Sequence, residues 1–219
     1  MVHLLDTGTD VTLDSARGLI RCRYHRPEGA LMGATVLVGG TDGGLDGPAD
    51  HLYPNLAQEL LPYGIASLRL DFRLHTAPGI VEEGVYDVAC GLSFLREEGA
   101  PRIGLVGHSF GGAVVITTAA HSQEVSAVVT LSTQSAETRL ADRIAPRPLL
   151  LVHGSDDIRL PPECSEYVYH IAREPKELII LQGARHSLRQ HRAELLALLV
   201  RWMGEKLGPP PELVGKEGP

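Results

Sequence analysis

Short runs of aliphatic residues recur along the chain from residue 34 onward, and longer segments with helical periodicity separate them. Several runs are apolar at successive positions, as in Leu-Leu-Leu-Val at residues 149–152, which is typical of strands that helices cover on both faces. Strands that alternate with helices in this way form mostly parallel sheets. The pattern therefore predicts an α/β fold. The six predicted strands span residues 34–38, 65–70, 102–106, 125–131, 149–153 and 177–181.

Helices are predicted between these strands. The expected ranges are residues 49–61, 81–98, 110–121, 162–172 and 187–207, with Gly64 and Gly99 at two of the helix ends. Upstream, residues 11–26 contain two extended segments around Asp-Ser-Ala-Arg-Gly, which predicts a hairpin at one edge of the sheet. A length of 219 residues suits one α/β core. We therefore expect a single domain over residues 1–207, followed by a proline-rich, disordered tail at 208–219.

Composition excludes some partners and favours one compartment. Acidic residues outnumber basic ones, 27 to 20, and no long Lys/Arg run is present, which argues against nucleic-acid binding. The cysteines at 22, 90 and 164 are odd in number and lack the paired spacing of a zinc site, so we expect buried free thiols in a reducing compartment. The first eight residues meet charge too soon for a signal peptide, and no apolar run approaches membrane-spanning length. We expect a cytoplasmic protein with no membrane partner, and we leave its oligomeric state open.

A serine lies at the junction between a predicted strand and a predicted helix. Residues 107–111 read Gly-His-Ser-Phe-Gly, which fits Gly-x-Ser-x-Gly with Ser109 at its centre. On such a sharp turn the serine backbone is strained, and the flanking glycines let backbones approach closely. The helix N-terminus then points towards negative charge that develops during nucleophilic attack. Ser109 is therefore the predicted nucleophile. A plain glycine-rich turn is the alternative.

The segment around Ser109 resembles a known family. Residues 105–112, Leu-Val-Gly-His-Ser-Phe-Gly-Gly, are similar to the nucleophile elbow of the α/β-hydrolase superfamily, and above all to its compact members related to dienelactone hydrolases and small serine esterases. With two further matching segments, the resemblance covers residues 11–207. Dienelactone hydrolases generally carry cysteine as the nucleophile, so their particular lactone substrate is not implied. The resemblance implies a mostly parallel sheet with helices on both faces.

The resemblance also implies an acid and a histidine that follow Ser109 in the chain. The strand at 149–153 runs into a segment similar to the superfamily pattern His-Gly-x-x-Asp-x-x-Val-Pro, and this register selects Asp157. Asp156 is the rival, with a turn or capping role as its other explanation. His186 lies in Gly-Ala-Arg-His-Ser, between the last strand and the last helix, as the family's catalytic histidine does. A serine needs such a base, and the base needs an anion.

An oxyanion hole needs two backbone N–H donors. The residue after the nucleophile, Phe110, supplies one, and the loop at residues 38–44 supplies the other. Alignment to the family pattern selects Thr41, with Gly40 and Asp42 left open. Where many relatives have His-Gly, this loop has Gly-Gly, a variant that resembles acyltransferase and thioesterase-like members. We expect a turn role for Asp42.

Two other residue groups near this edge of the sheet are weaker candidates. Such Asp-x-Arg segments as residues 71–73 are generally structural in the superfamily, so Arg73 and His75 are expected to be structural as well. His153 ends a predicted strand, and we expect it to belong to the loop scaffold. His191 lies inside the last predicted helix, where a surface or groove-lining role is expected.

Together these features predict a serine hydrolase that cleaves carboxylic esters, in particular short-chain or small soluble esters and lactones, through an acyl-enzyme on Ser109. The predicted reaction needs no metal and no organic cofactor. Only residues 132–148 lie where caps are inserted in this superfamily, so little or no cap domain and an open site are expected. An acyltransferase or thioesterase with the same triad is the main alternative. A ligand-binding protein on a hydrolase scaffold is a third.

Overall fold

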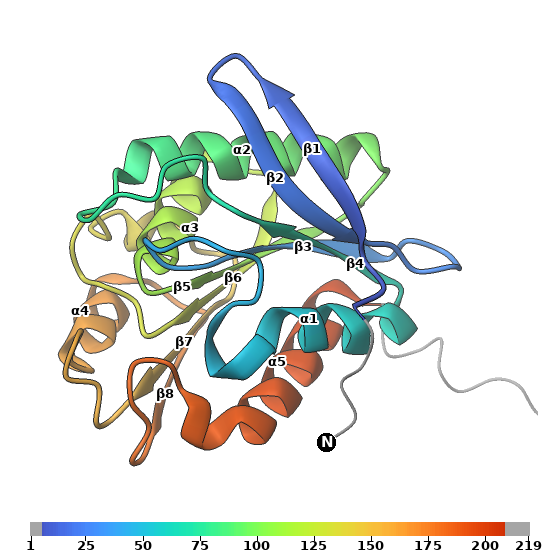
Figure 1. The fold of residues 1–219 in the computed structure, drawn as a ribbon. Helices are drawn as coiled ribbons and strands as arrows, with labels where there is room; N and C mark the ends of the chain where they lie inside the picture. The colour runs from blue at the N-terminus through green and yellow to red at the C-terminus, as the bar shows by residue number, and fades with distance from the viewer. Residues whose placement is uncertain (1–5, 209–219) are drawn as a thin grey trace, which may run out of the picture.

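The computed structural model describes residues 6–208, and the strands in this range form one eight-stranded sheet (Figure 1). Their order across the sheet is β1-β2-β4-β3-β5-β6-β7-β8. The strands are β1 (Thr9–Ser15), β2 (Gly18–His25), β3 (Gly33–Val38), β4 (Ile65–Leu70), β5 (Ile103–His108), β6 (Val125–Leu131), β7 (Leu149–Gly154) and β8 (Lys176–Leu181).

Six of these strands run parallel to one another. Each neighbouring pair from β4 through β3, β5, β6 and β7 to β8 is parallel, whereas β1 and β2 form an antiparallel hairpin that joins β4 through β2. This hairpin at the edge was predicted from the sequence. Because the parallel strands all end at the same edge of the sheet, the loops that follow them meet there.

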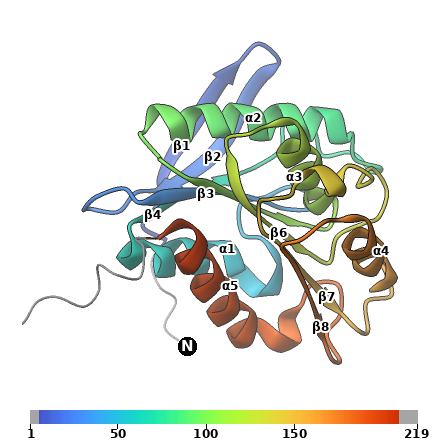
Figure 2. The same ribbon diagram turned by 180° about the vertical axis from the view of Figure 1, so that it is seen from behind.

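Helices cover both faces of the sheet (Figures 1 and 2). In the described part of the chain they are α1 (Pro48–Leu60), α2 (Val81–Glu97), α3 (Phe110–His121), α4 (Glu163–Ile171) and α5 (Arg192–Leu207). Helices α1 and α5 bury one cluster of apolar side chains against the sheet, and α2, α3 and α4 bury a second cluster on the opposite face. The mostly parallel, doubly covered sheet predicted from the sequence is confirmed.

Most residues of the parallel strands from β4 to β7 are buried, as their continuous apolar runs predicted. Every residue of β3, β4 and β7 is buried. By contrast, the edge strand β1 contains only exposed and half-buried residues. A sheet that helices cover on both faces excludes water from both sides of its central strands, and this burial is the main stabilising contribution to such a fold.

The start of the last helix differs from the sequence prediction. We expected the helix to span residues 187–207, but α5 begins at Arg192. The intervening residues form turns, among them one 3-10 turn at Arg189–His191. Leu188 has a φ of 57°, a left-handed conformation that interrupts a right-handed helix. The Ser187 carbonyl is also drawn away, because it accepts a 2.8 Å hydrogen bond from the Ala49 amide of α1.

Between β6 and β7 there is no cap in the described structure. Residues 132–148 contain one 3-10 turn, Ala141–Arg143, and otherwise turns and loops. Among residues 6–208, no helix is both long and apolar enough to cross a membrane. The predicted tail at 208–219 lies, from residue 209 on, outside the described residues. The single domain over residues 1–207 stays a prediction.

Candidate active site

Ser109 lies on a sharp turn between β5 and α3. Its backbone has φ 56° and ψ −117°, a conformation that residues other than glycine rarely adopt. The Ser109 amide donates a 2.9 Å hydrogen bond to the Leu131 carbonyl at the end of β6. Close packing holds the turn from the other side, because a Cβ at Gly111 would clash with the Gly39 carbonyl oxygen and would lie 3.0 Å from that of Val38. The flanking glycine is therefore required by the space available.

Three residues predicted for chemistry form one hydrogen-bonded chain. The Ser109 Oγ lies 3.1 Å from Nε2 of His186, and Nδ1 of His186 lies 2.7 Å from Oδ2 of Asp157. Because a carboxylate only accepts, Nδ1 carries the imidazole proton, and Nε2 is free to accept from the serine hydroxyl. The rival Asp156 is exposed, and its carboxylate accepts from the Ser155 hydroxyl instead. Asp157 is thus the carboxylate that meets the histidine.

The Asp157 carboxylate is buried and fully hydrogen-bonded. Its Oδ1 accepts from the amides of Arg159 at 2.9 Å and Leu160 at 3.1 Å, and its side chain has no exposed surface. Burial by itself raises the pKa of Asp157, but hydrogen bonds from His186 and from these two amides outweigh burial and hold the pKa below its usual value. The carboxylate therefore stays ionised and fixes the His186 ring.

A second histidine supports the loop that carries His186. The Nε2 of His108 donates a 3.1 Å hydrogen bond to the backbone carbonyl of His186, and the two rings lie 5.0 Å apart. Burial lowers the pKa of His108 to about 4. The ring is therefore neutral near pH 7, and it adds no positive charge beside His186.

The glycine-rich loop after β3 passes over Ser109. A 3.1 Å hydrogen bond from the Gly43 amide to the Gly40 carbonyl closes a turn with Thr41 and Asp42 at its centre. Gly40 lies against Ser109, because a Cβ built there would be 3.8 Å from Ser109 Oγ. The closing hydrogen bond does not use the Thr41 amide. Asp42 is exposed, as its predicted turn role requires.

Phe110 is the first residue of α3. Its amide belongs to the first turn of the helix, where N–H groups have no intrahelical acceptor. Its ring packs edge-on against Phe72 at 5.4 Å. The apolar ring thus anchors the start of the helix, while the amide remains beside Ser109 at the positive end of the helix dipole.

Sequence comparison gives little. No family model matches the chain. A 43-residue segment is 44% identical to the uncharacterized protein YfhR of Escherichia coli strain K12, and the match covers 20% of this chain and 15% of that protein. The chain thus spans about 15% of the length of the curated relative that it matches.

Structure comparison covers nearly the whole chain. Est1E from Butyrivibrio proteoclasticus aligns with 90% of this chain and 98% of its own at a TM-score of 0.79 and 16% identity. The esterase domain of a Rhodothermus marinus protein aligns with 92% of this chain and 100% of its own, at a TM-score of 0.75 and 22% identity. XC6422 from Xanthomonas campestris, described as an α/β serine hydrolase without lid, aligns with 93% of this chain and 97% of its own. The TM-score is 0.73 and the identity is 18%. The chain has the α/β-hydrolase fold.

In this α/β-hydrolase fold, a buried aspartate at the end of β4 holds the glycine-rich loop. The Oδ1 of Asp71 accepts a 2.6 Å hydrogen bond from the Gly44 amide and one of 2.8 Å from His75, while Oδ2 pairs with Arg21 at 2.5 Å. Arg73 turns to α2, where it pairs with Asp87 and Glu83. These contacts agree with the structural role predicted for this segment.

The cleft above Ser109 is small and polar. Its volume is about 360 Å³, and it is lined by loop residues 39–43, by residues 46–51, and by Ser109, His186, Arg159 and Arg189. Two of the lining residues, Arg189 and Asp50, form an ion pair at 2.8 Å. Within residues 6–208, no group of three or more His, Cys, Asp or Glu residues could hold a metal ion.

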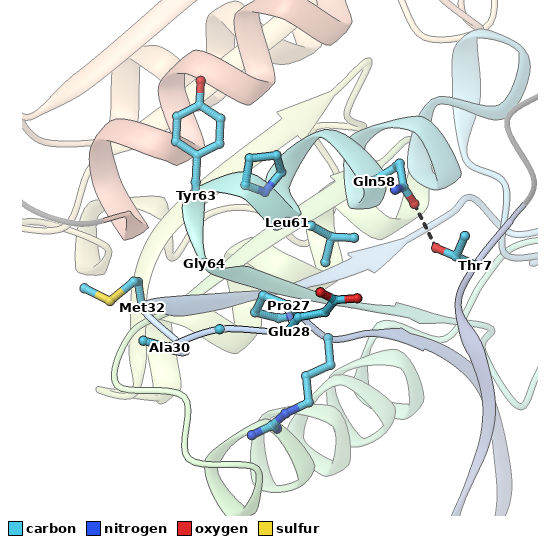
Figure 3. Close-up of a pocket in the computed structure, with 12 residues that line it drawn as sticks. Thr7, Pro27, Glu28, Ala30, Met32, Gln58, Leu61, Tyr63 and Gly64 are labelled. Atoms are coloured by element: carbon cyan, nitrogen blue, oxygen red, sulfur yellow. Dashed lines mark hydrogen bonds between the residues drawn. The ribbon is translucent and has the colours of Figure 1, made fainter. Parts of the chain in front are cut away.

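A larger cavity of about 820 Å³ lies elsewhere on the α/β-hydrolase fold (Figure 3). It is lined by residues 26–30 and 61–64, together with Thr7, Met32 and Gln58. Met32 and Gly64 come directly before β3 and β4, so this cavity lies at the edge where the parallel strands begin. It contains none of the residues predicted for chemistry, and it is not the candidate active site.

Sequence reasoning missed some contacts of this site. The contact of His108 with the His186 loop and the Asp71 contact with the glycine-rich loop join segments far apart in the chain. One signal was available for His153, since it stands four residues before Asp157 in the motif that selected the acid. His191 lies in the 3-10 turn and not inside the helix, and its ring bonds to the Gln182 carbonyl and Glu194.

Proposed function

We propose that the protein is a serine hydrolase that cleaves carboxylic esters through an acyl-enzyme on Ser109. The observation that carries the proposal is the hydrogen-bonded chain from Ser109 through His186 to Asp157, at the edge of the sheet where the parallel strands end. Two of the similar structures are described as an esterase domain and as a serine hydrolase. Their names support the reaction class that the side chains suggest.

The first half of the reaction forms the acyl-enzyme. Nε2 of His186 takes the proton of the Ser109 hydroxyl as Oγ attacks the ester carbonyl carbon. The Asp157 carboxylate stabilises the imidazolium that results. When the tetrahedral intermediate collapses, the bond from the carbonyl carbon to the alcohol oxygen breaks, and the alcohol leaves with the proton from His186.

The second half releases the acid. His186 takes a proton from water as the water oxygen attacks the acyl carbonyl, and collapse of the second intermediate returns this proton to Ser109 Oγ. Hydrolysis of the ester is then complete, and the enzyme is restored. Both halves of the reaction use only protein groups and water, and neither requires a metal or an organic cofactor.

The oxyanion of both intermediates is held by the amides of Phe110 and Thr41. Phe110 begins α3, so its N–H is free and the helix dipole favours negative charge there. The Thr41 amide is unused by the turn that closes from Gly43 to Gly40, and this turn passes over Ser109. Such donors lower the barrier because they are aimed before the charge develops.

Short-chain or small soluble esters and lactones are the proposed substrates. The cleft of about 360 Å³ has polar walls, and the described segment between β6 and β7 contains no cap that would shelter a long acyl chain. The cytoplasmic location expected from the cysteines stays a prediction. All three thiols are free, but only Cys22 is buried as expected, whereas Cys90 and Cys164 are half-buried.

An acyltransferase or thioesterase with the same three residues is the second candidate. Its support is the Gly-Gly sequence at 39–40, which replaces the more common His-Gly and puts no side chain over Ser109. Adding alcohols or thiols to the assay separates the two, because a transferase forms the new ester or thioester in preference to the free acid.

The proposal is tested by hydrolysis of short-chain aryl esters. We expect turnover by the wild-type protein and loss of turnover in Ser109→Ala, with an unchanged circular dichroism spectrum as evidence that the fold is intact. Full activity in the folded variant would exclude Ser109 as the nucleophile and overturn the proposal.

A further inference from the structure

Two imidazole rings reach the same oxygen of Asp157. His186 contacts Oδ2 at 2.7 Å from the cleft side, and Nε2 of His153 lies 3.2 Å from that oxygen on the buried side. The side chains of His153 and Asp157 both have 0% of their surface exposed. The proposed esterase reaction uses His186 and leaves His153 without a role, although its ring lies 3.2 Å from the acid.

The hydrogen bonds of His153 define its protonation. Nε2 lies 2.8 Å from the Leu160 carbonyl oxygen, which only accepts, so Nε2 carries a proton. Nδ1 lies 2.6 Å from Ser165 Oγ of α4 and accepts from this hydroxyl. In that tautomer the Nε2–H donates to the Leu160 carbonyl, and Asp157 Oδ2 lies 3.2 Å from the same nitrogen. The ring therefore places a neutral N–H beside the acid.

Burial also favours the neutral ring. It lowers the pKa of His153, and the opposing effects of the Leu160 carbonyl and of Asp157 do not reverse the shift. The titratable groups that act on this imidazole are Asp157 and His186, and His108 lies close enough to be influenced by it. A protonated His153 would pair with the carboxylate and compete with His186 for its charge. A neutral donor orients the carboxylate and leaves its charge available.

We propose that His153 is a positioning residue that fixes the Asp157 carboxylate so that Oδ2 faces His186. The inference rests on the proposed function. Oδ1 of Asp157 is held by two backbone amides, whereas Oδ2 lies 2.7 Å from Nδ1 of His186 and 3.2 Å from Nε2 of His153. During turnover the His186 ring gains and loses a proton at Nε2 and is charged in between, whereas the buried His153 ring stays neutral beside the same oxygen. Ser165 fixes the His153 ring in turn and thereby couples α4 to the acid.

Two substitutions at His153 separate positioning from space filling. His153→Phe keeps the ring volume and removes the donor, whereas His153→Gln retains an N–H at the place of Nε2. With an aryl acetate as substrate, we expect kcat to fall about ten-fold or more in His153→Phe, because a buried hydrogen bond to a charged group is lost. KM should stay unchanged, and His153→Gln should recover most of kcat.

A third variant and a spectroscopic signal keep the inference testable if a His153 variant fails to fold. Ser165→Ala removes the hydroxyl that fixes the His153 ring, and we expect a smaller loss of kcat at constant KM. The low-field proton NMR signal of His186 Nδ1–H reports its bond to Asp157 without any turnover, and we expect it to move in His153→Phe and Ser165→Ala but not in His153→Gln. Unchanged kcat and an unmoved signal in the folded variants would overturn the inference, as would equal losses in the Phe and Gln variants.

Failure of the proposed function has a different signature. If hydrolysis persists in Ser109→Ala, the esterase proposal fails, and so does the role given to His153 within it. If hydrolysis depends on Ser109 but is insensitive to His153 and Ser165, only the positioning role fails. Variants that lose thermal stability but retain kcat would assign His153 to packing alone.

Discussion

Ser109 is held in a backbone conformation that costs free energy. A non-glycine residue in such a region costs on the order of 1–3 kcal/mol, and it persists here because β5, α3 and the end of β6 fix the chain on both sides. The strain raises the hydroxyl above the sheet, where His186 reaches it. At this residue, folding stability is exchanged for a hydroxyl held within reach of His186.

This strain predicts the order of stability of two inactive variants. Glycine adopts positive φ without steric cost, whereas alanine does not. We therefore expect Ser109→Gly to be more stable than Ser109→Ala by about 1 kcal/mol, measured by urea unfolding. Equal stability of the two variants would mean that the backbone of Ser109 carries no strain.

Neighbouring carboxylates provide a matched test of the acid. Asp157→Asn places an amide against Nδ1 of His186 and favours the wrong tautomer, so kcat should fall by roughly 10³–10⁴-fold. Asp156→Asn should leave kcat near the wild-type value, because its carboxylate is exposed and bonds only to Ser155 among the described side chains. Initial-rate kinetics on an aryl acetate decide between them, and a larger loss at Asp156 would contradict the assignment.

At the scale of elements, the turn at residues 40–43 depends on glycine at its last position. The φ of Gly43 is 68°, and a side chain there would meet His75 and Asp71. Asp71 holds the following amide of Gly44. A buried carboxylate therefore fixes a loop whose own residues are small and supply few side-chain contacts.

Proline at position 41 tests the second oxyanion donor. Proline suits the second position of a turn and follows glycine without strain, so Thr41→Pro removes one N–H and keeps the loop. We expect kcat to fall by roughly 10²–10³-fold with little change in KM, whereas Asp42→Ala should retain activity. A fully active Thr41→Pro variant would transfer the donor role to another amide of the loop.

Element order was predictable because apolar periodicity reports burial, and burial decides strands and helices in this fold. Three predicted segments, at 65–70, 110–121 and 125–131, match β4, α3 and β6 without adjustment. The start of α5 was wrong because Leu188 takes a left-handed conformation that its side chain does not signal. Contacts such as His108 with His186 could not be predicted, since they depend on how loops from different strands approach one another.

At the scale of the whole molecule, histidines buried as neutral rings link stability to pH. Burial lowers the pKa of His108 and of His25 from 6.5 to about 4. The unfolded chain binds these protons more readily, so both residues favour the folded state above pH 6.5. This contribution is lost progressively as the pH falls through 6.5 towards about 4.

We therefore expect the free energy of unfolding to decrease between pH 6.5 and about 4, by up to roughly 1.4 kcal/mol per pH unit for each of the two histidines. Urea unfolding at a series of pH values measures the decrease. His108→Gln, which cannot take up this proton, should give a shallower slope. A slope equal to that of the wild type would mean that His108 does not contribute.

In the proposed reaction, Ser109 carries the acyl group during ester hydrolysis. The most direct measurement is mass spectrometry of the protein quenched in acid during turnover of an aryl acetate, followed by peptide mapping. We predict one added acetyl group on the peptide that contains Ser109 in the wild-type protein, and none in Ser109→Ala. Turnover with an acetyl group on a different residue, or an unmodified Ser109 in an enzyme whose hydrolysis survives Ser109→Ala, would contradict the account.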